Sequence, residues 1–208
     1  MKILKVPEST IVRLSMYSRY LTKKYRIGIK QISSDDIAEG VGVKSPVVRK
    51  DLAYFGEFGI RGVGYNTLSL NNNILKILNL DLEWNIALVG LGSLGRALAS
   101  YEGFIKRKLI IKNIFDNDPK KVGTKINGIE VLSTECMENE IWKNRISIGI
   151  ISTPAFAAQE TANSFVKAKV KAILNFAPIA LNVPSYIEIR NVDLSVNLEV
   201  MSFNMSYK

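Results

Sequence analysis

The sequence predicts an α/β protein in two parts, a small basic domain of helices followed by a doubly wound parallel sheet. Three observations lead to this prediction. Charge is unevenly divided along the chain, a short apolar strand runs into a glycine-rich loop near the middle, and strands alternate with helices beyond that loop. Residues 1–80 hold 13 Lys and Arg against 6 Asp and Glu, whereas residues 81–208 hold 15 against 13. A basic unit joined to a nearly neutral one suggests that the first part binds a polyanion.

Composition narrows the possible classes of protein. The 208 residues carry a net charge of +9, are 47% hydrophobic, and include one Cys and no His. No apolar run approaches the roughly 20 residues that cross a bilayer, and the N-terminus lacks a signal-peptide core. Cys136 alone cannot form an internal disulfide, so we expect a cytoplasmic protein. The absence of His removes the commonest metal ligand and general acid–base, and no metal site is expected.

The first 80 residues predict three helices with recognisable starts. The first begins near Pro7, because Pro is tolerated in the first turn of a helix. Ser33 is a suitable cap for the second, which has acidic residues in its first turn and ends at Gly42. Ser45 is expected to cap the third, with Pro46 at the first helical position. The second and third helices are therefore separated only by a tight turn.

Two short helices joined in this way form a helix-turn-helix, which we place at about Met16 to Phe55. The later helix would read the major groove, and the glycines after it would allow a β-ribbon wing. Arg can make two hydrogen bonds to a guanine edge, and Lys or a helix N-terminus can hold phosphate. The candidate DNA-binding residues are Lys44, Ser45, Arg49, Lys50, Tyr54 and Arg61. An ordinary helical domain with solvated charges remains an alternative.

A dinucleotide-binding loop is predicted in the middle of the chain. The apolar strand Ile86 to Val89 runs into the sequence GLGSLG at residues 90–95, and a helix follows. Gly90 would let the chain turn, Gly92 would let the backbone approach a pyrophosphate, and Gly95 would let the helix pack on the strand. The phosphates would rest on the helix N-terminus.

The next strand indicates which dinucleotide is expected. It ends at Asp116, whose carboxylate could accept both ribose hydroxyls and would repel a 2′-phosphate, so NADH and NAD⁺ are favoured over NADP(H). Asp118 is interpreted as a helix cap. Two later strands end at residues 153–155 and 175–178. These strand ends would form the floor of the pocket where the nicotinamide half lies. The candidate cofactor-binding residues are Gly90, Leu91, Gly92, Ser93, Leu94, Gly95, Asp116, Thr153, Pro154, Ala155, Asn175, Phe176, Ala177, Pro178, Tyr101 and Phe104.

The dinucleotide is expected to be a ligand and not a reagent. A dehydrogenase needs a group that exchanges a proton with substrate, yet His is absent and Tyr101 has no evident Lys partner. After the first 80 residues, a single nucleotide-binding domain uses the remaining chain and leaves no substrate domain. An NAD-dependent dehydrogenase with a basic dimerisation arm remains an alternative. So does a DNA-binding protein whose second domain binds another nucleotide such as CoA.

Segments spread along the chain resemble the Rex family of redox-sensing bacterial transcriptional repressors. They lie at residues 48–52, 54–59, 61–65, 90–98, 101–104, 115–119, 157–159, 174–178 and 191–194. The resemblance implies a homodimer that binds palindromic operators when NADH is scarce and releases them when NADH binds. It implies a winged-helix domain in 1–80, a Rossmann domain that binds NAD(H) in 81–193, and a C-terminal helix in 194–208 that is exchanged in the dimer.

The resemblance also implies a switch made of an Arg, a Tyr and an Asp, which match Arg13, Tyr101 and Asp193. One carboxylate could pair with the arginine or accept the tyrosine hydroxyl, which would give a two-state element. An apolar pocket floor at Ala155 and Phe104 would disfavour the cationic ring of NAD⁺. The chain departs from the family at position 47, where Val stands in place of a frequent Gln, and in its Asn-rich tail.

Overall fold

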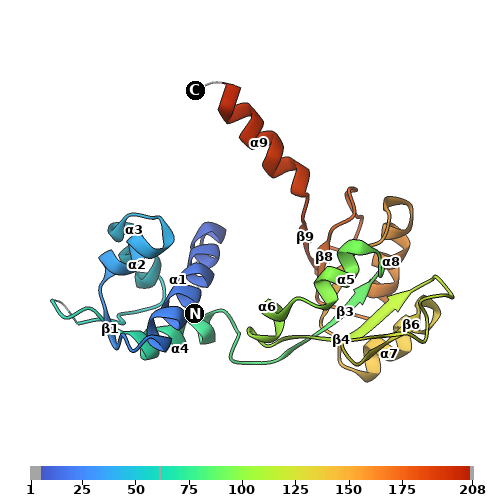
Figure 1. The fold of residues 1–208 in the computed structure, drawn as a ribbon, viewed down its shortest axis with the longest axis horizontal. Helices are drawn as coiled ribbons and strands as arrows, with labels where there is room; N and C mark the ends of the chain where they lie inside the picture. The colour runs from blue at the N-terminus through green and yellow to red at the C-terminus, as the bar shows by residue number, and fades with distance from the viewer. Residues whose placement is uncertain (1–5, 61, 207–208) are drawn as a thin grey trace. The chain divides into compact units, whose positions relative to one another are not determined.

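The structure, a computed structural model, describes residues 6–60 and 62–206 (Figure 1). It divides into two compact units, Met1–Leu82 and Glu83–Lys208. Each unit has a hydrophobic core of its own. Among the described residues, no helix is long and apolar enough to span a membrane.

The first unit packs helices over a small antiparallel ribbon (Figure 1). Its elements are α1 (Glu8–Arg26), β1 (Gln31–Ile32), α2 (Ser34–Val41), α3 (Ser45–Ala53), β2 (Tyr65–Asn66) and α4 (Thr67–Ile77). Leu14, Tyr17 and Leu21 form one buried stripe of α1 because they recur at helical spacing. They pack against Val48 and Leu52 of α3, so the third helix is fixed to the core along one face.

The predicted cap residue is observed at the start of α2 but not at the start of α3. Ser33 caps α2 in a reciprocal box, since its hydroxyl accepts from the Asp36 amide at 3.0 Å and its amide donates to Asp36 at 2.9 Å. Ser45, in contrast, is not a cap, because Lys44 holds the extended N-cap position and Ser45 is already helical. Pro46 allows this earlier start because the amides of the whole first turn lack partners within the helix.

The wing region between α3 and β2 is only partly described. Ile60 and Gly64 form an isolated antiparallel bridge, consistent with a tight ribbon. Gly62 and Gly64 have positive φ values of 80° and 90°, which glycine adopts without strain. The candidate DNA-binding residue Arg61 lies outside the described residues.

The second unit is built on a seven-stranded, mainly parallel sheet with the strand order β5-β6-β4-β3-β7-β8-β9. Its strands are β3 (Trp84–Val89), β4 (Leu109–Asp116), β5 (Lys125–Ile126), β6 (Ile129–Ser133), β7 (Ile148–Ile151), β8 (Ala172–Asn175) and β9 (Glu188–Asn191). Its helices are α5 (Ser93–Ala99), α6 (Glu102–Ile105), the 3-10 turn η1 (Thr134–Cys136), α7 (Met137–Lys143), α8 (Ala155–Lys167) and α9 (Leu194–Ser206). Only the edge strand β5 runs antiparallel to its neighbour. The predicted α/β fold of a small helical domain followed by a Rossmann-like sheet is confirmed.

Helices cover the two faces of this sheet unequally. On one face α7 and α8 pack through Ile141 and Phe165, and the absence of a side chain at Gly149 leaves room for the Phe165 ring. On the other face α5 packs through Leu98 against β3 and β7. The strand order reverses between β3 and β7, and this switch point is where ligands bind in doubly wound sheets.

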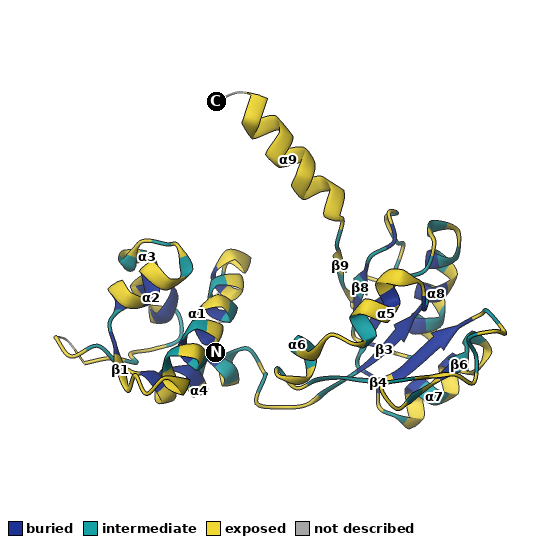
Figure 2. Cartoon of the chain, in the orientation of Figure 1, coloured by how far each residue is buried: buried dark blue, intermediate teal, exposed yellow. Residues whose placement is uncertain are grey.

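The C-terminal helix α9 has no buried residue (Figure 2). Its exposed apolar side chains are Leu194, Val196, Leu198, Val200, Met201, Phe203 and Met205. A helix this apolar with no buried face has the composition of one that packs against another chain.

Candidate functional site

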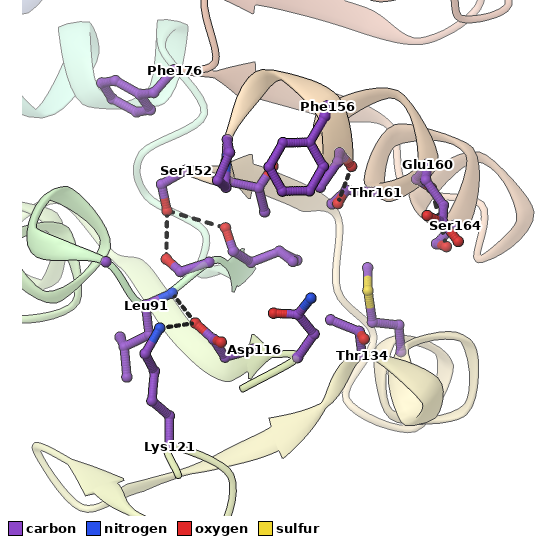
Figure 3. A pocket seen from close by; sticks show the side chains of 18 of the residues that line it. Leu91, Asp116, Lys121, Thr134, Ser152, Phe156, Glu160, Thr161, Ser164 and Phe176 are labelled. Carbon is purple, nitrogen blue, oxygen red and sulfur yellow. Dashed lines mark hydrogen bonds and ion pairs between the residues drawn. The ribbon is translucent and has the colours of Figure 1, made fainter. Parts of the chain in front are cut away.

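A pocket of about 710 Å³ lies at the carboxyl ends of the central strands, beside the switch point (Figure 3). Val89, Asp116 and Ser152 end β3, β4 and β7 or directly follow them, and all three line it. Figure 3 shows Phe176 at one end of the pocket and Thr134, Glu160 and Ser164 at the other. The pocket is therefore an elongated cleft that crosses the strand ends.

The glycine loop shapes one wall of this pocket. Gly90 has a φ of +94°, and a side chain there would meet the Ser152 carbonyl at 2.8 Å. Gly95 packs so closely on the Gly90 carbonyl that no methyl group fits between them. A methyl at Gly92, in contrast, would meet no atom within 4 Å, although Gly92 lines the pocket. Two of the glycines therefore close the loop on itself, and the third leaves space where a ligand can approach the backbone.

Asp116 is held at the base of the loop by three donors. Its carboxylate accepts from the Leu91 amide at 2.6 Å and the Lys121 ammonium at 3.1 Å (Figure 3). It also accepts from the Asp118 amide at 2.9 Å. Burial alone would raise the pKa of Asp116, but these amides and the ammonium outweigh it and hold the pKa below its usual range. Asp116 is therefore ionised at neutral pH and can accept a hydrogen bond from a ribose hydroxyl. The adjacent Lys121 offsets part of its charge.

Other predicted residues fall into two groups. Leu91, Leu94, Thr153, Pro154 and Phe176 line the pocket together with Gly90, Gly92 and Asp116. The remaining candidates do not line it: Ser93, Gly95, Ala155, Asn175, Ala177, Pro178, Tyr101 and Phe104. Ser93 and Ala155 are the first residues of α5 and α8, so their amides lie at helix N-termini beside the cleft.

Asn175 has a different place from the one that the sequence predicts. It is fully buried, and its amide bonds to the loop that follows β8, so it is not a floor of the pocket. The ring centroids of Tyr101 and Phe104 lie 5.1 Å apart in an edge-to-face pair, and both residues line a separate cavity of about 350 Å³. Asp118 is a second correction. It bonds the Lys120 amide at 3.0 Å in a turn that is not continued into a helix.

Sequence reasoning missed one side of the pocket. Asn117, Lys121, Thr134, Glu135, Met137, Phe156, Glu160, Thr161 and Ser164 also line it. Thr134 directly follows β6, so the rule that strand ends meet at one edge could have found it. The residues of α8 carry no such signal, because they enter the pocket only through the packing of α8 beside α7.

The chemistry of the pocket fits a dinucleotide. The Thr153 hydroxyl oxygen is buried and, among the described residues, has no hydrogen-bond partner. A buried hydroxyl in such a position is costly unless something else bonds to it. Together with the open space at Gly92 and the ionised Asp116, it provides separate places for a phosphate and for a ribose. No metal ion is required by this set.

The second candidate site is the exposed face of α3 in the first unit. Lys44, Arg49 and Lys50 are exposed there, whereas Val48 and Leu52 face the core. The Arg49 guanidinium donates to the hydroxyls of Ser34 and Ser45, both at 3.0 Å. Tyr54 directly follows the helix and is half-buried. The helix and its N-cap therefore present three exposed cations outside the core.

The three residues of the implied switch have partners within their own units. Arg13 pairs with Asp51 of α3. Tyr101 stays about half exposed beside Phe104. Asp193 caps α9, since its carboxylate accepts from the Ser195 amide at 2.8 Å and the Ser195 hydroxyl at 2.7 Å.

Comparisons with known proteins cover both units. A family model described as "Putative DNA-binding protein N-terminus" matches residues 5–53, and one described as "CoA binding domain" matches residues 81–179. The redox-sensing transcriptional repressor Rex of Desulfitobacterium hafniense is 60% identical over 205 residues, which span 99% of this chain and 98% of the relative. The protein of the same name from Carboxydothermus hydrogenoformans is 57% identical and covers 99% of each chain.

Solved structures agree with these relatives. RSP, a Rex-family repressor, has been solved in complex with β-NAD⁺ and operator DNA, and that structure matches with a TM-score of 0.92 and 42% identity over 97% of this chain and 93% of its own. The complex of RSP with β-NADH matches with a TM-score of 0.87 and 40% identity over 98% and 95%. With identity and fold shared along almost its whole length, the chain belongs to the Rex family of redox-sensing transcriptional repressors.

Proposed function

We propose that this repressor senses NADH in the cleft at the strand ends and releases its operator DNA when NADH binds. As a member of the Rex family it is a DNA-binding regulator of transcription and not an enzyme. The observation that carries the proposal is the combination, in one pocket, of the open glycine loop at Gly92 with the ionised carboxylate of Asp116. The chain works as a homodimer, and the place of action we propose is the cytoplasm.

Different residues of the pocket contact the pyrophosphate, the adenosine ribose and the nicotinamide half of the dinucleotide. Gly92 and the amides at the start of α5 hold the pyrophosphate, because a helix N-terminus favours anions. Asp116 accepts the hydroxyls of the adenosine ribose. Thr153 and Pro154 contact the nicotinamide half, and Phe176 bounds that end of the cleft. NADH is favoured over NAD⁺ there, because an apolar surround disfavours a cationic ring.

The operator contacts come from α3. Arg49 reads a base edge, Lys44 and Lys50 hold phosphates, and the start of the helix at Ser45 adds amide donors. Tyr54 and Arg61 add contacts at the end of the helix and at the wing. A two-fold dimer presents two such helices, so the operator is a palindrome with matched half-sites.

The ligand acts through the difference in its affinity for two dimer arrangements. In the arrangement that binds DNA, Asp193 pairs with Arg13, and in the NADH-bound one it accepts the Tyr101 hydroxyl. The exposed apolar helix α9 carries Asp193 to the partner by exchange between subunits. Because coupling is reciprocal, operator DNA weakens NADH binding by the same factor by which NADH weakens DNA binding.

The decisive experiment is a gel shift on a palindromic promoter duplex with NADH and NAD⁺ titrated separately. NADH is expected to release the duplex, whereas NAD⁺ is expected to compete with NADH without driving release. Retention of DNA at saturating NADH would overturn the proposal. CoA, suggested by the description of the matching family model, serves as a third titrant and is expected to leave the complex intact.

A further inference from the structure

The buried side chain of Asn175 connects the ligand cleft to the strand that leads into α9. Asn175 is the last residue of β8, and Phe176, which directly follows it, lines the cleft. The Asn175 side-chain oxygen accepts from the Ala177 amide at 2.9 Å, and its nitrogen donates to the carbonyls of Ala177 and Ile179 at 3.1 and 3.0 Å. The start of the loop that carries Phe176 is thus held by this amide group and by the Phe176 backbone amide, which donates to the Ile151 carbonyl at 2.9 Å.

The same side chain also reaches the neighbouring strand. The Asn175 nitrogen, whose two hydrogens are shared among three acceptors, also donates to the side-chain oxygen of Asn191 at 2.9 Å, and the Asn175 carbonyl accepts from the Val192 amide at 2.8 Å. Asn191 is the last residue of β9, two positions before Asp193, the cap of α9. Since β9 is an edge strand paired only with β8, these two bonds fix the point from which α9 departs.

We propose that Asn175 is a positioning residue that transmits occupancy of the cleft to the base of α9. Contact of a ligand with Phe176 moves the loop segment that Asn175 holds, and the bond to Asn191 carries that movement to the strand end before Asp193. A buried amide whose oxygen and nitrogen are both bonded cannot turn without breaking these bonds, so it links the two segments stiffly. The inference rests on the proposed function and assigns the connection between its two ends.

The chain offers a matched control for the bond between Asn175 and Asn191. The same loop is fastened on its other side by Gln159 of α8, which accepts from the Asn182 amide at 2.8 Å and donates to the Asn182 carbonyl at 3.0 Å. Replacing Gln159 therefore removes hydrogen bonds of the same loop without touching β9. Replacing Asn191, which is exposed, removes only the bond toward β9 and keeps the bonds of Asn175 within the loop.

The test measures the factor by which saturating NADH weakens binding to a palindromic duplex selected with the wild-type protein. In Asn191→Ala this factor is expected to fall about fivefold, the equivalent of one hydrogen bond, while the Kd of NADH for the free protein stays within twofold. Asn191→Asp keeps an acceptor oxygen and is expected to retain the wild-type factor. Gln159→Ala is also expected to retain it.

Each other outcome has a definite meaning. A wild-type factor in Asn191→Ala, an equal loss in Gln159→Ala, or a changed NADH affinity in free Asn191→Ala would overturn the role of Asn175. If NADH does not weaken DNA binding by the wild-type protein, the proposed function itself fails. The two failures are therefore distinguished by the wild-type measurement alone.

Discussion

Arg13 and Asp51 form a two-point ion pair that joins α1 to α3, the helix that carries the candidate DNA contacts. The Arg13 Nε atom lies 2.6 Å from Asp51 Oδ2, and Nη2 lies 2.7 Å from Oδ1. The hydroxyls of Thr10 and Tyr17 donate to the same carboxylate at 2.9 and 2.8 Å. Asp51 is almost fully buried, and the three residues that donate to it here all lie on α1. This carboxylate therefore adds a polar attachment between α1 and α3 to the apolar packing of Val48 and Leu52.

Loss of this ion pair is expected to destabilise the first unit. Removal of one partner from a buried pair costs about 3–5 kcal/mol, and Arg13→Met should lie near the lower end because Thr10 and Tyr17 still donate to Asp51. Calorimetric unfolding of the full chain measures the change. Arg19→Met, an exposed position on the same helix, is the control and should stay within about 0.5 kcal/mol. Equal losses in both variants would contradict the prediction.

The same cluster predicts how stability depends on pH. Burial alone would raise the pKa of Asp51, but the hydrogen bonds from Arg13, Tyr17 and Thr10 outweigh it and lower the pKa. A lowered carboxyl pKa stabilises the fold above the unfolded value of about 3.9, and this contribution is lost as the pH falls through the lowered pKa. Asp51→Asn should therefore flatten the acid limb of the stability curve below about pH 5.

The alkaline limb has the opposite sign. Burial, and then the hydrogen bond to Asp51, raise the pKa of Tyr17 above its usual range. A raised pKa stabilises the fold below the unfolded value of about 10, and this contribution is lost as the pH rises through the raised value. Tyr17→Phe should flatten this limb, and it should reduce the acid limb without abolishing it, because Arg13 and Thr10 still lower the pKa of Asp51. Unfolding in urea across the pH range measures both, and an unchanged alkaline limb would contradict the assignment.

Sequence patterns predicted the elements better than the directions of side chains. An apolar strand, three spaced glycines and a following helix sufficed to place the loop at residues 90–95, because the turn requires Gly90 and the packing of the helix requires Gly95. Asn175 was expected at the cleft because it ends a strand beside it, and nothing in the local sequence shows that its amide turns back to the next loop. Lys121 was missed because its long side chain reaches Asp116 from a turn.

The glycines of the loop separate stability from ligand affinity. A methyl group at Gly95 would overlap the Gly90 carbonyl, so Gly95→Ala should lower the unfolding temperature of the second unit. A methyl at Gly92 meets no protein atom, and the φ there is −75°, so Gly92→Ala should fold normally. It should nevertheless weaken NADH binding at least tenfold by obstructing the phosphates. NADH fluorescence titration measures this, and unchanged affinity in Gly92→Ala would remove the loop from the site.

The carboxylate of Asp116 is expected to set the affinity for the ribose. Hydrogen bonds to a charged group contribute about 1.5–3 kcal/mol, so Asp116→Ala should weaken NADH binding about 10- to 100-fold. Asp118→Ala is the matched control because Asp118 also lies near Lys121, at 3.8 Å, yet does not line the pocket. Its NADH affinity should stay within about twofold. Similar losses in both variants would show that charge near Lys121 matters and that the ribose contact does not.

The exposed cations of α3 are expected to act differently on DNA. The hydroxyls of Ser34 and Ser45 both accept from Arg49 Nη1, and an arginine guanidinium can make two hydrogen bonds to a guanine edge. Arg49→Ala should cost about 1–3 kcal/mol on the selected operator and little on random duplex. Lys50→Ala should weaken binding to both duplexes alike and reduce the slope of log affinity against log salt by about one.

A charge-matched control is Lys76→Ala on α4, an exposed position away from α3. Its salt slope should stay at the wild-type value, because a cation that touches no phosphate releases no counterion on binding. If Lys76→Ala and Lys50→Ala change the slope equally, the DNA is attracted by the net charge of the unit and α3 is not its docking face. If Arg49→Ala loses affinity equally on both duplexes, Arg49 holds phosphate and the base reading lies elsewhere on the helix.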